Sequence, residues 1–178
     1  MRHGLIITAI GRDRPGIVDR ISGAVFRAGC NLEDSRMAIL GGEFALMALA
    51  SGPPERLREL ESGVGAIGAE LALTTVFKPT RIDESRADLK DRIPYRVTAV
   101  ALDHPGIVHR LSHLLAEHDV NVADLETRLT HAPISGAPMF SLALLAQVPA
   151  DLPVSRLRDA LGALADAENI DIDLRAVP

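Results

Sequence analysis

An internal repeat constrains the fold of this chain more than any other feature of its sequence. The segment ITAIGRDRPGIV starts at Ile7, and the similar segment VTAVALDHPGIV starts ninety positions later, at Val97. The same offset aligns further residues of the two copies, namely Arg20 with Arg110, Ser22 with Ser112, Asn31 with Asn121 and Asp34 with Asp124. Self-similarity sustained in register over this length predicts two tandem copies of one fold.

The hydrophobic pattern of the first copy alternates between strand and helix periodicity. An apolar run before the Asp-x-Pro-Gly turn predicts a buried strand, and the apolar stripe after Pro15 predicts a helix that ends near Gly29. The expected elements are strand 5–10, helix 15–28, strands 30–40 and 44–50, a helix opened by Pro53-Pro54, and strand 71–77. The second copy repeats this order over 95–102, 105–118, 120–130, 139–148, 154–167 and 170–177.

This βαββαβ order indicates the α+β class. It predicts two tandem ferredoxin-like units, in each of which two helices cover one face of an antiparallel sheet. The polar and charged segment 79–93 is typical of a linker. The expected domains are therefore residues 1–78 and residues 94–178.

Composition excludes several classes of function. The net charge is −5 at pH 7, and the sequence contains no basic run of the kind that neutralises phosphates on a nucleic acid. Aromatic residues make up only 3% of the chain, which disfavours stacking platforms for bases. We therefore expect no direct contact with nucleic acid.

The single cysteine, Cys30, excludes an internal disulfide and fits a reducing compartment. No apolar stretch is long enough to span a membrane, and the N-terminal apolar run is too short for a signal peptide. The expected location is the cytoplasm, without membrane contact.

The repeated turn between the first strand and the first helix is the main candidate for binding chemistry. Pro15 suits the first helical position, and Asp13 or the next residue suits the cap. Gly16 leaves the first turn without side-chain cover, so free amides and the positive end of the helix dipole can accept an anion such as a carboxylate. The alternative is that the turn only caps the helix.

Two asparagines strengthen the ligand hypothesis. Asn31 and Asn121 follow the first helix of each copy at the start of the next strand. We expect the helix to return beside its own starting edge, so that an asparagine there can reach the ammonium or carboxylate group of an amino acid. Each would contribute one acceptor and two donors.

Other chemistry is weakly indicated. His109 and His113 have the i, i+4 spacing that can hold a metal, but they lie opposite the apolar stripe of their helix and no third ligand is evident, so a solvent-facing pair is the favoured interpretation. Cys30 aligns with Val120 and is interpreted as a small buried apolar residue. No nucleophile, phosphate-binding or dinucleotide motif occurs in the sequence. We therefore expect neither enzymatic activity nor a cofactor.

Two features suggest a surface outside the single unit. Phe26 lies half a turn from the apolar stripe of its helix, and the predicted strand FALMALA is apolar at consecutive positions. A sheet covered on one face should alternate. The hypotheses are burial by flanking loops, or a surface that pairs the two copies of the repeat or forms a dimer, and we favour the second.

The segments DRPGIV…GCNLEDSR and DHPGIV…DVNVADLETR resemble the ACT domain, a ligand-sensing module of amino-acid metabolism. The resemblance covers the chain as two tandem ACT units. More narrowly, the chain is similar to the two-ACT repressors of the glycine cleavage system. It implies a ligand site between paired units, at the turn into the first helix and the start of the second strand. The matching residues are Asp13, Arg14, Pro15, Gly16, Ile17, Cys30 and Asn31, and in the second copy Asp103, His104, Pro105, Gly106, Ile107, Val120 and Asn121.

The two candidate sites differ in charge. Arg14 carries a permanent charge and a fork of donors for a carboxylate, whereas His104 titrates near neutral pH. Gly11 is replaced by Ala101, which is expected to narrow the approach to the second site. If one site alone binds ligand, the charge favours the first.

The resemblance implies a regulator that senses a small amino acid, such as glycine or serine, and controls transcription through a partner regulator protein. Two units use the whole chain, so neither an enzyme domain nor a helix-turn-helix is expected. Homo-oligomers formed by ACT pairing are expected. The alternative is a regulatory subunit for an enzyme of amino-acid metabolism, and an uncharacterised enzyme is a third possibility.

Overall fold

The computed structural model describes residues 2–82 and 91–177. The chain divides into two compact units, Met1–Ser85 (unit 1) and Arg86–Pro178 (unit 2). Most of the predicted linker, residues 83–90, lies outside the described residues. Its flanks differ from the prediction, because residues 79–82 and 92–93 belong to strands.

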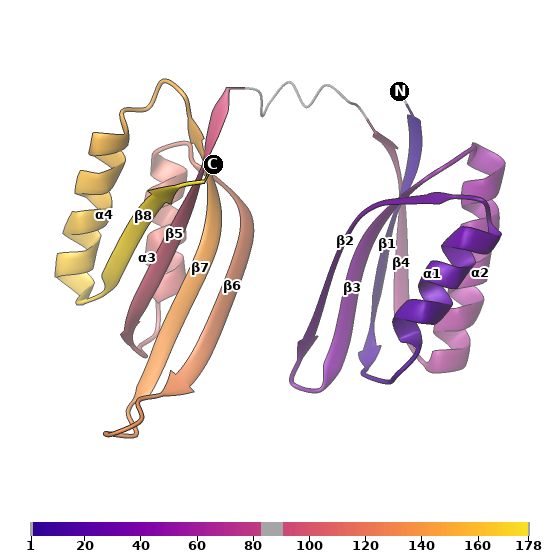
Figure 1. The fold of residues 1–178 in the computed structure, drawn as a ribbon, viewed down its shortest axis with the longest axis horizontal. Coiled ribbons are helices and arrows are strands. Elements are labelled where there is room, and N and C mark those ends of the chain that lie inside the picture. The colour runs from indigo at the N-terminus through magenta and orange to yellow at the C-terminus, as the bar shows by residue number, and fades with distance from the viewer. Residues whose placement is uncertain (1, 83–90, 178) are drawn as a thin grey trace. The chain divides into compact units, whose positions relative to one another are not determined.

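Unit 1 is a four-stranded antiparallel sheet with two helices on one face (Figure 1). Its elements are β1 (Arg2–Arg12), α1 (Ile17–Arg27), β2 (Asn31–Leu40), β3 (Glu43–Ser51), α2 (Pro54–Leu71) and β4 (Thr74–Ile82). The strand order is β2-β3-β1-β4. This arrangement confirms the predicted βαββαβ unit.

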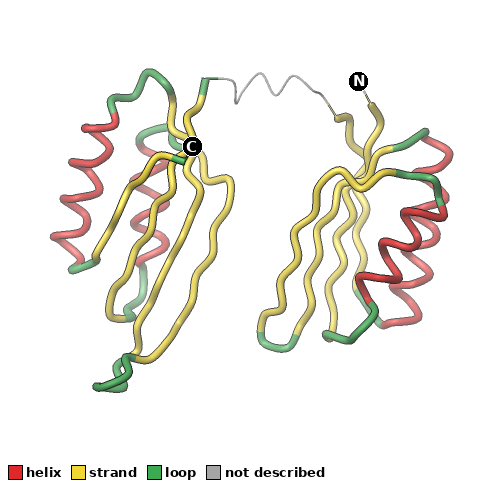
Figure 2. The backbone as a smooth tube through the Cα atoms, in the orientation of Figure 1, coloured by secondary structure: helices red, strands yellow, loops and turns green. Residues whose placement is uncertain are grey.

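Unit 2 repeats the arrangement with the strand order β6-β7-β5-β8 (Figure 2). Its elements are β5 (Arg92–Leu102), α3 (Ile107–Glu117), β6 (Asn121–His131), β7 (Pro138–Pro149), α4 (Val154–Glu168) and β8 (Asp171–Ala176). The β6–β7 connection is longer than the Gly41-Gly42 turn of unit 1. The insertion therefore falls in a hairpin loop, where extra residues are tolerated.

Each unit has its own core between the helices and one face of the sheet. In unit 1 the buried side chains of β1 and β3 alternate along the strands, and Phe44 is only 1% exposed. The opposite face of β3 carries Met47, which is 55% exposed. The consecutive apolar residues of β3 thus belong to two faces, one packed against the helices and one open within the unit (the open face).

The helix ends follow local chemistry. Gly29 has φ 66° just beyond α1, and the N–H of Cys30 donates to the Val25 carbonyl at 3.1 Å, which confirms the predicted glycine at this helix end. Asp119 adopts the same left-handed conformation in unit 2, with φ 54°. The N–H of Val120 then donates to Leu115 at 2.9 Å.

Equivalent ion pairs join the two helices of each unit. The Arg20 guanidinium donates to both carboxylate oxygens of Glu70 on α2, with an Nη1–Oε1 distance of 2.5 Å. Arg110 Nε lies 3.0 Å from Glu168 Oε2 on α4. The hydrogen bond from Arg20 lowers the pKa of Glu70. Both units thus have an ion pair that joins their two helices.

Candidate ligand site at the helix starts

The turn into α1 leaves the start of the helix without a side-chain cap. Gly16 is the N-cap residue and has φ 93°, a left-handed conformation that favours glycine. The helix begins at Ile17, so the expectation of Pro15 at the first helical position and Asp13 or Arg14 at the cap is wrong. The chain needs the left-handed glycine to turn from strand to helix, which moves the helix start by two residues.

The first amides of α1 are consequently available. The first intrahelical bond runs from Arg20 N–H to the Gly16 carbonyl at 3.0 Å, so the N–H groups of Ile17, Val18 and Asp19 have no acceptor within the helix. The Ile17 side chain is buried and fixes the turn on the core. This end of the helix offers donors and a positive dipole to an anion.

The flanking residues of this turn have separate roles. Asp13 N–H donates to the Gly42 carbonyl at 3.1 Å, which ties the turn to the β2–β3 hairpin. Arg14 is exposed, and its guanidinium has no partner among the described residues. It is therefore free to bind a carboxylate beside the helix amides.

Unit 2 reproduces the turn with a different side chain. Gly106 is the N-cap with φ 101°, and Asp103 N–H donates to the Pro138 carbonyl at 2.9 Å. His104 is half-buried, with Nδ1 3.4 Å from the Pro105 carbonyl oxygen. The backbone conformation of the two candidate sites thus matches, whereas unit 2 has His104 where unit 1 has Arg14.

The asparagines at the start of β2 and β6 already have partners within their units. Asn31 Nδ2 donates to Glu33 Oε1 at 3.1 Å, and the same oxygen accepts hydrogen bonds from Ser51 and Arg2. The bonds from Ser51 and then Asn31 lower the pKa of Glu33. Asn121 Nδ2 donates to Gln147 Oε1 at 2.7 Å.

These bonds leave the side-chain oxygens available. Neither Asn31 Oδ1 nor Asn121 Oδ1 has a partner among the described residues. Each can accept a hydrogen bond from a donor such as an ammonium group. Glu33 is two residues from Asn31 on the same strand, whereas Gln147 meets Asn121 only through the β6–β7 register, which the sequence did not indicate.

The helix start and the asparagine lie at opposite ends of the same unit. The pairing of β3 aligns Asn31 with Gly4 through Ser51, whereas Asp13 lies beside Gly42 at the other end of β1. The whole of α1, 11 residues or about 16 Å, separates the helix start from the asparagine. The expectation that one unit brings both groups together is wrong, because α1 runs the length of the sheet between them.

Cys30 and Val120 contribute packing. Cys30 is half-buried against the core, and burial raises the pKa of its thiol, which opposes the thiolate form that nucleophiles need. Val120 is buried in the core of unit 2. Both therefore support the start of the strand and do not present a reactive group.

The difference between Gly11 and Ala101 concerns the core. A Cβ atom on Gly11 would lie 2.7 Å from Leu73 Cδ2 and 3.2 Å from the Ala72 carbonyl oxygen, and Ala101 is buried in unit 2. Both positions face the helices of their own unit. The expectation that Ala101 narrows the approach to the second site is therefore wrong.

The histidine pair of α3 faces solvent, as predicted. His109 and His113 are exposed and stacked, with ring centroids 6.0 Å apart, and His113 Nε2 lies 3.5 Å from Glu117 Oε1. Within residues 2–82 and 91–177, no group of three or more His, Cys, Asp or Glu side chains could hold a metal ion. The same ranges contain no helix with the length and apolar character of a membrane span.

The geometry of both units agrees with comparison to known proteins. The sequence model of the ACT domain family matches residues 3–78 and again residues 97–175. The chain belongs to the ACT domain family. A crystal structure of an unknown protein from Galdieria sulphuraria has the same tandem ACT architecture over 100% of both chains, with a TM-score of 0.84 and 27% identity.

Two curated relatives are similar over nearly the whole tandem ACT chain. The glycine cleavage system transcriptional repressors of Escherichia coli (strain K12) and Shigella flexneri are each 34% identical over 176 residues. The match covers 99% of this chain and 91% of each relative. The chain is therefore a tandem ACT protein related to regulators, and the names of these relatives describe repressors rather than enzymes.

Proposed function

We propose that this protein is an amino-acid-responsive regulator that binds a small amino acid at its ACT helix starts and controls transcription through a partner regulator protein in the cytoplasm. The observation that carries the proposal is the uncapped start of α1. The start of α1 combines backbone N–H groups without an intrahelical acceptor, the left-handed Gly16 and the unpaired Arg14, with Asp13 and Asp19 beside them. These donors suit the carboxylate of an amino acid.

Completion of the site requires a second ACT unit. Within a unit the whole of α1, 11 residues or about 16 Å, separates the helix start from the asparagine, beyond the reach of a small amino acid. Antiparallel pairing of two units would place residues 13–17 of one opposite residues 30–31 of the other. The carboxylate would then bind the helix amides and the ammonium group would donate to Asn31 Oδ1.

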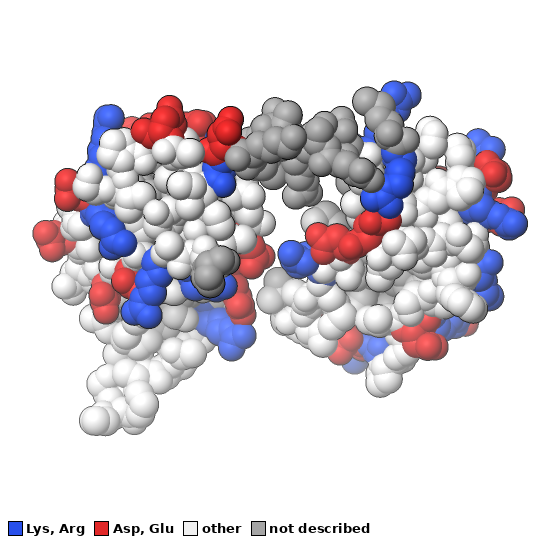
Figure 3. All heavy atoms as spheres, turned by 45° about the horizontal axis from the view of Figure 1, so that its top comes forward, with Lys and Arg blue, Asp and Glu red and all other residues white. Residues whose placement is uncertain are grey.

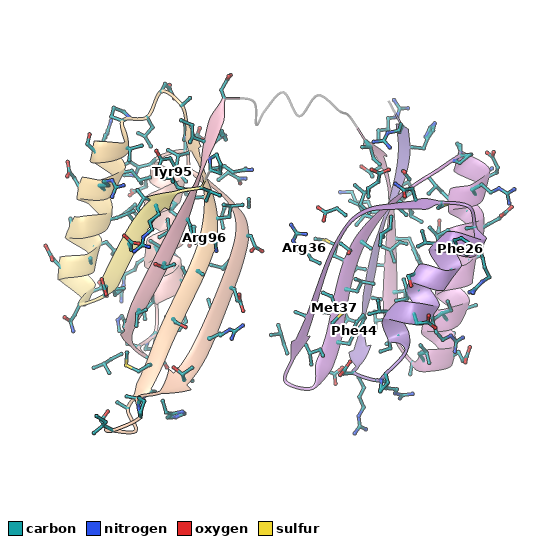
Figure 4. All side chains as sticks on the ribbon, in the orientation of Figure 1. Phe26, Arg36, Met37, Phe44, Tyr95 and Arg96 are labelled. Atoms are coloured by element: carbon teal, nitrogen blue, oxygen red, sulfur yellow. The ribbon has the colours of Figure 1, made fainter. Side chains whose placement is uncertain are left out.

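Exposed apolar residues support this pairing. Phe26 on α1 is 84% exposed, and Met37 on the neighbouring edge strand is more than half exposed (Figure 4). Phe26 lies near the end of α1, and Met37 lies on β2, which is an edge strand of its sheet. Burial of such side chains between copies would stabilise a homo-oligomer.

The size of the ligand limits its affinity. A glycine molecule has five heavy atoms, and at about 1.5 kcal/mol per atom the binding free energy reaches about 7.5 kcal/mol. The dissociation constant is therefore on the order of micromolar at best. That range suits a sensor of a metabolite pool.

The proposed output passes through a protein partner. On the face drawn in Figure 3, Lys and Arg side chains alternate with Asp and Glu side chains, without an extended basic surface. Combined with the net charge of −5, this distribution disfavours binding to DNA. A pull-down should recover a protein with a DNA-binding domain, and recovery of a metabolic enzyme would favour the alternative of an enzyme regulator.

Calorimetric titration of the full chain with each amino acid tests the ligand. Arg14→Ala should weaken binding of the effective amino acid by tenfold or more, since a charged hydrogen bond contributes about 1.5–3 kcal/mol. Arg12→Ala is the matched control, because Arg12 is exposed two residues earlier. Heat from none of the amino acids, or equal losses in both variants, would refute the proposal.

A further inference from the structure

The open face of the unit 2 sheet carries a shallow pocket away from the helix starts. It has a volume of about 180 Å³ and is lined by Arg96, Thr98, Asp173 and Arg175, which come from the neighbouring strands β5 and β8. Tyr95 packs against the core on the helix side, so the next residue, Arg96, faces the other way (Figure 4).

The charges of this pocket are unbalanced. Arg96 lies directly opposite Arg175 in the β5–β8 register, and like charges in that position destabilise a sheet. Arg175 Nε is 2.5 Å from Asp173 Oδ2, whereas Arg96 has no partner among the described residues. The four side chains therefore carry one positive charge in excess, and an anion held by Arg96 would relieve the repulsion.

Unit 1 lacks this arrangement at the same positions of the repeat. The register places Ile6 where unit 2 has Arg96, Val76 in place of Asp173, and Lys78 in place of Arg175. In the β1–β4 pair, the cation Lys78 thus lies opposite the apolar residue Ile6. The charged pocket is consequently specific to unit 2 and is not a by-product of the fold.

We propose that the Arg96–Thr98–Asp173–Arg175 pocket is a second binding site, specific for the carboxylate group of a small molecule. A planar carboxylate can accept two hydrogen bonds from the Arg96 guanidinium and one from the Thr98 hydroxyl. Asp173 opposes a second negative charge and therefore selects against dianions.

This site is independent of the proposed function, since its residues lie on the open face and not at residues 13–17 or 103–107. Titration of the full chain at constant ionic strength, followed by the backbone amide resonances, separates the two. Sodium acetate should shift the resonances of Thr98 and Asp173, and methylammonium chloride should not. Glycine would produce the same shifts if the carboxylate is taken from an amino acid, and acetate alone would indicate a simple carboxylate.

Arg96→Ile, which installs the residue found in unit 1, tests the assignment. It should weaken acetate binding at Thr98 by at least tenfold, while Lys78→Ile, the matched change in unit 1, leaves it unchanged. Without a carboxylate, Arg96→Ile should raise the thermal midpoint by about 1–4 °C, because the arginine repulsion is removed. Absence of acetate shifts at Thr98 and Asp173, or shifts that persist in Arg96→Ile, would overturn the proposal; resonances of Ile17 and Ile107 report the helix starts separately.

Discussion

Units 1 and 2 share a backbone but present different open sheet faces. In unit 1 this face carries exposed Ile10, Met47 and Val76, whereas in unit 2 the pocket around Arg96 and Asp173 introduces charge. The helix starts keep the same left-handed glycine in both units and differ in one flanking side chain. The duplication therefore preserved what the backbone requires and allowed the surfaces to diverge.

The largest expected difference between the units lies in an aligned pair of phenylalanines. Phe44 is fully buried, whereas Phe140 is half-buried at the margin of its core. Phe44→Ala should lower the free energy of unfolding of unit 1 by about 3–5 kcal/mol through loss of buried area and a cavity. Phe140→Ala should cost unit 2 at most about 2 kcal/mol. Urea denaturation with hydrogen exchange assigned to each unit measures both, and equal losses would contradict the difference in burial.

Exchanging the aligned residues Gly11 and Ala101 tests how tightly each core is packed at this position. Gly11→Ala places a Cβ within 2.7 Å of Leu73 Cδ2, so unit 1 should lose about 1–3 kcal/mol from overpacking. Ala101→Gly should cost unit 2 about 0.5–1 kcal/mol, from the greater chain entropy of glycine. The same denaturation experiment applies, and a stabilised Gly11→Ala variant would show that Leu73 gives way without strain.

The shared turn should respond equally in the two units. Gly16→Ala and Gly106→Ala each force alanine into a left-handed conformation, at φ 93° and 101°, and should cost about 1–2 kcal/mol. Gly63→Ala, inside α2 with open space around it, is a control that should not destabilise the protein. A difference of more than about 1 kcal/mol between the two turn variants would break the equivalence.

The smallest expected effect is a dependence on acid. Hydrogen bonding to Arg20 lowers the pKa of Glu70 in the folded protein, so the contribution of this contact is present above the unfolded pKa of about 4.3 and is lost as the pH falls through the folded pKa. The stability advantage of the wild type over Glu70→Gln should therefore shrink between about pH 6 and pH 3. Glu43→Gln, on the β2–β3 hairpin, serves as the control in denaturation at each pH. An advantage that grows on acidification would contradict the sign of the pKa shift.

The fold was predictable from sequence because short-range patterns encode it. The Asp-x-Pro-Gly turns, Gly29 and Pro53-Pro54 mark the ends of elements, and apolar periodicity identifies the faces between them. The start of α1 was misplaced because the conformation of Gly16 overrides the preference of Pro15 for the first helical position. The site was less predictable, since the separation of Asn31 from the helix start depends on the direction in which α1 crosses the sheet.

The charged pocket had no sequence signal, because Arg96 and Arg175 are 79 positions apart and meet only through strand register. A count of charged residues cannot distinguish such a pair from two isolated surface arginines. Position within the repeat could have indicated it, through the contrast with Ile6. Register, rather than composition, is the information that was missing.

The distance between the helix start and Asn31 has a consequence for how such a sensor would behave. In the proposed arrangement, each module contributes only part of the binding site. The bound metabolite would therefore also stabilise the contact between modules. A mutation that prevents docking of modules and a mutation that removes a metabolite contact would then give the same cellular phenotype, and only a binding measurement on the purified assembly would tell them apart.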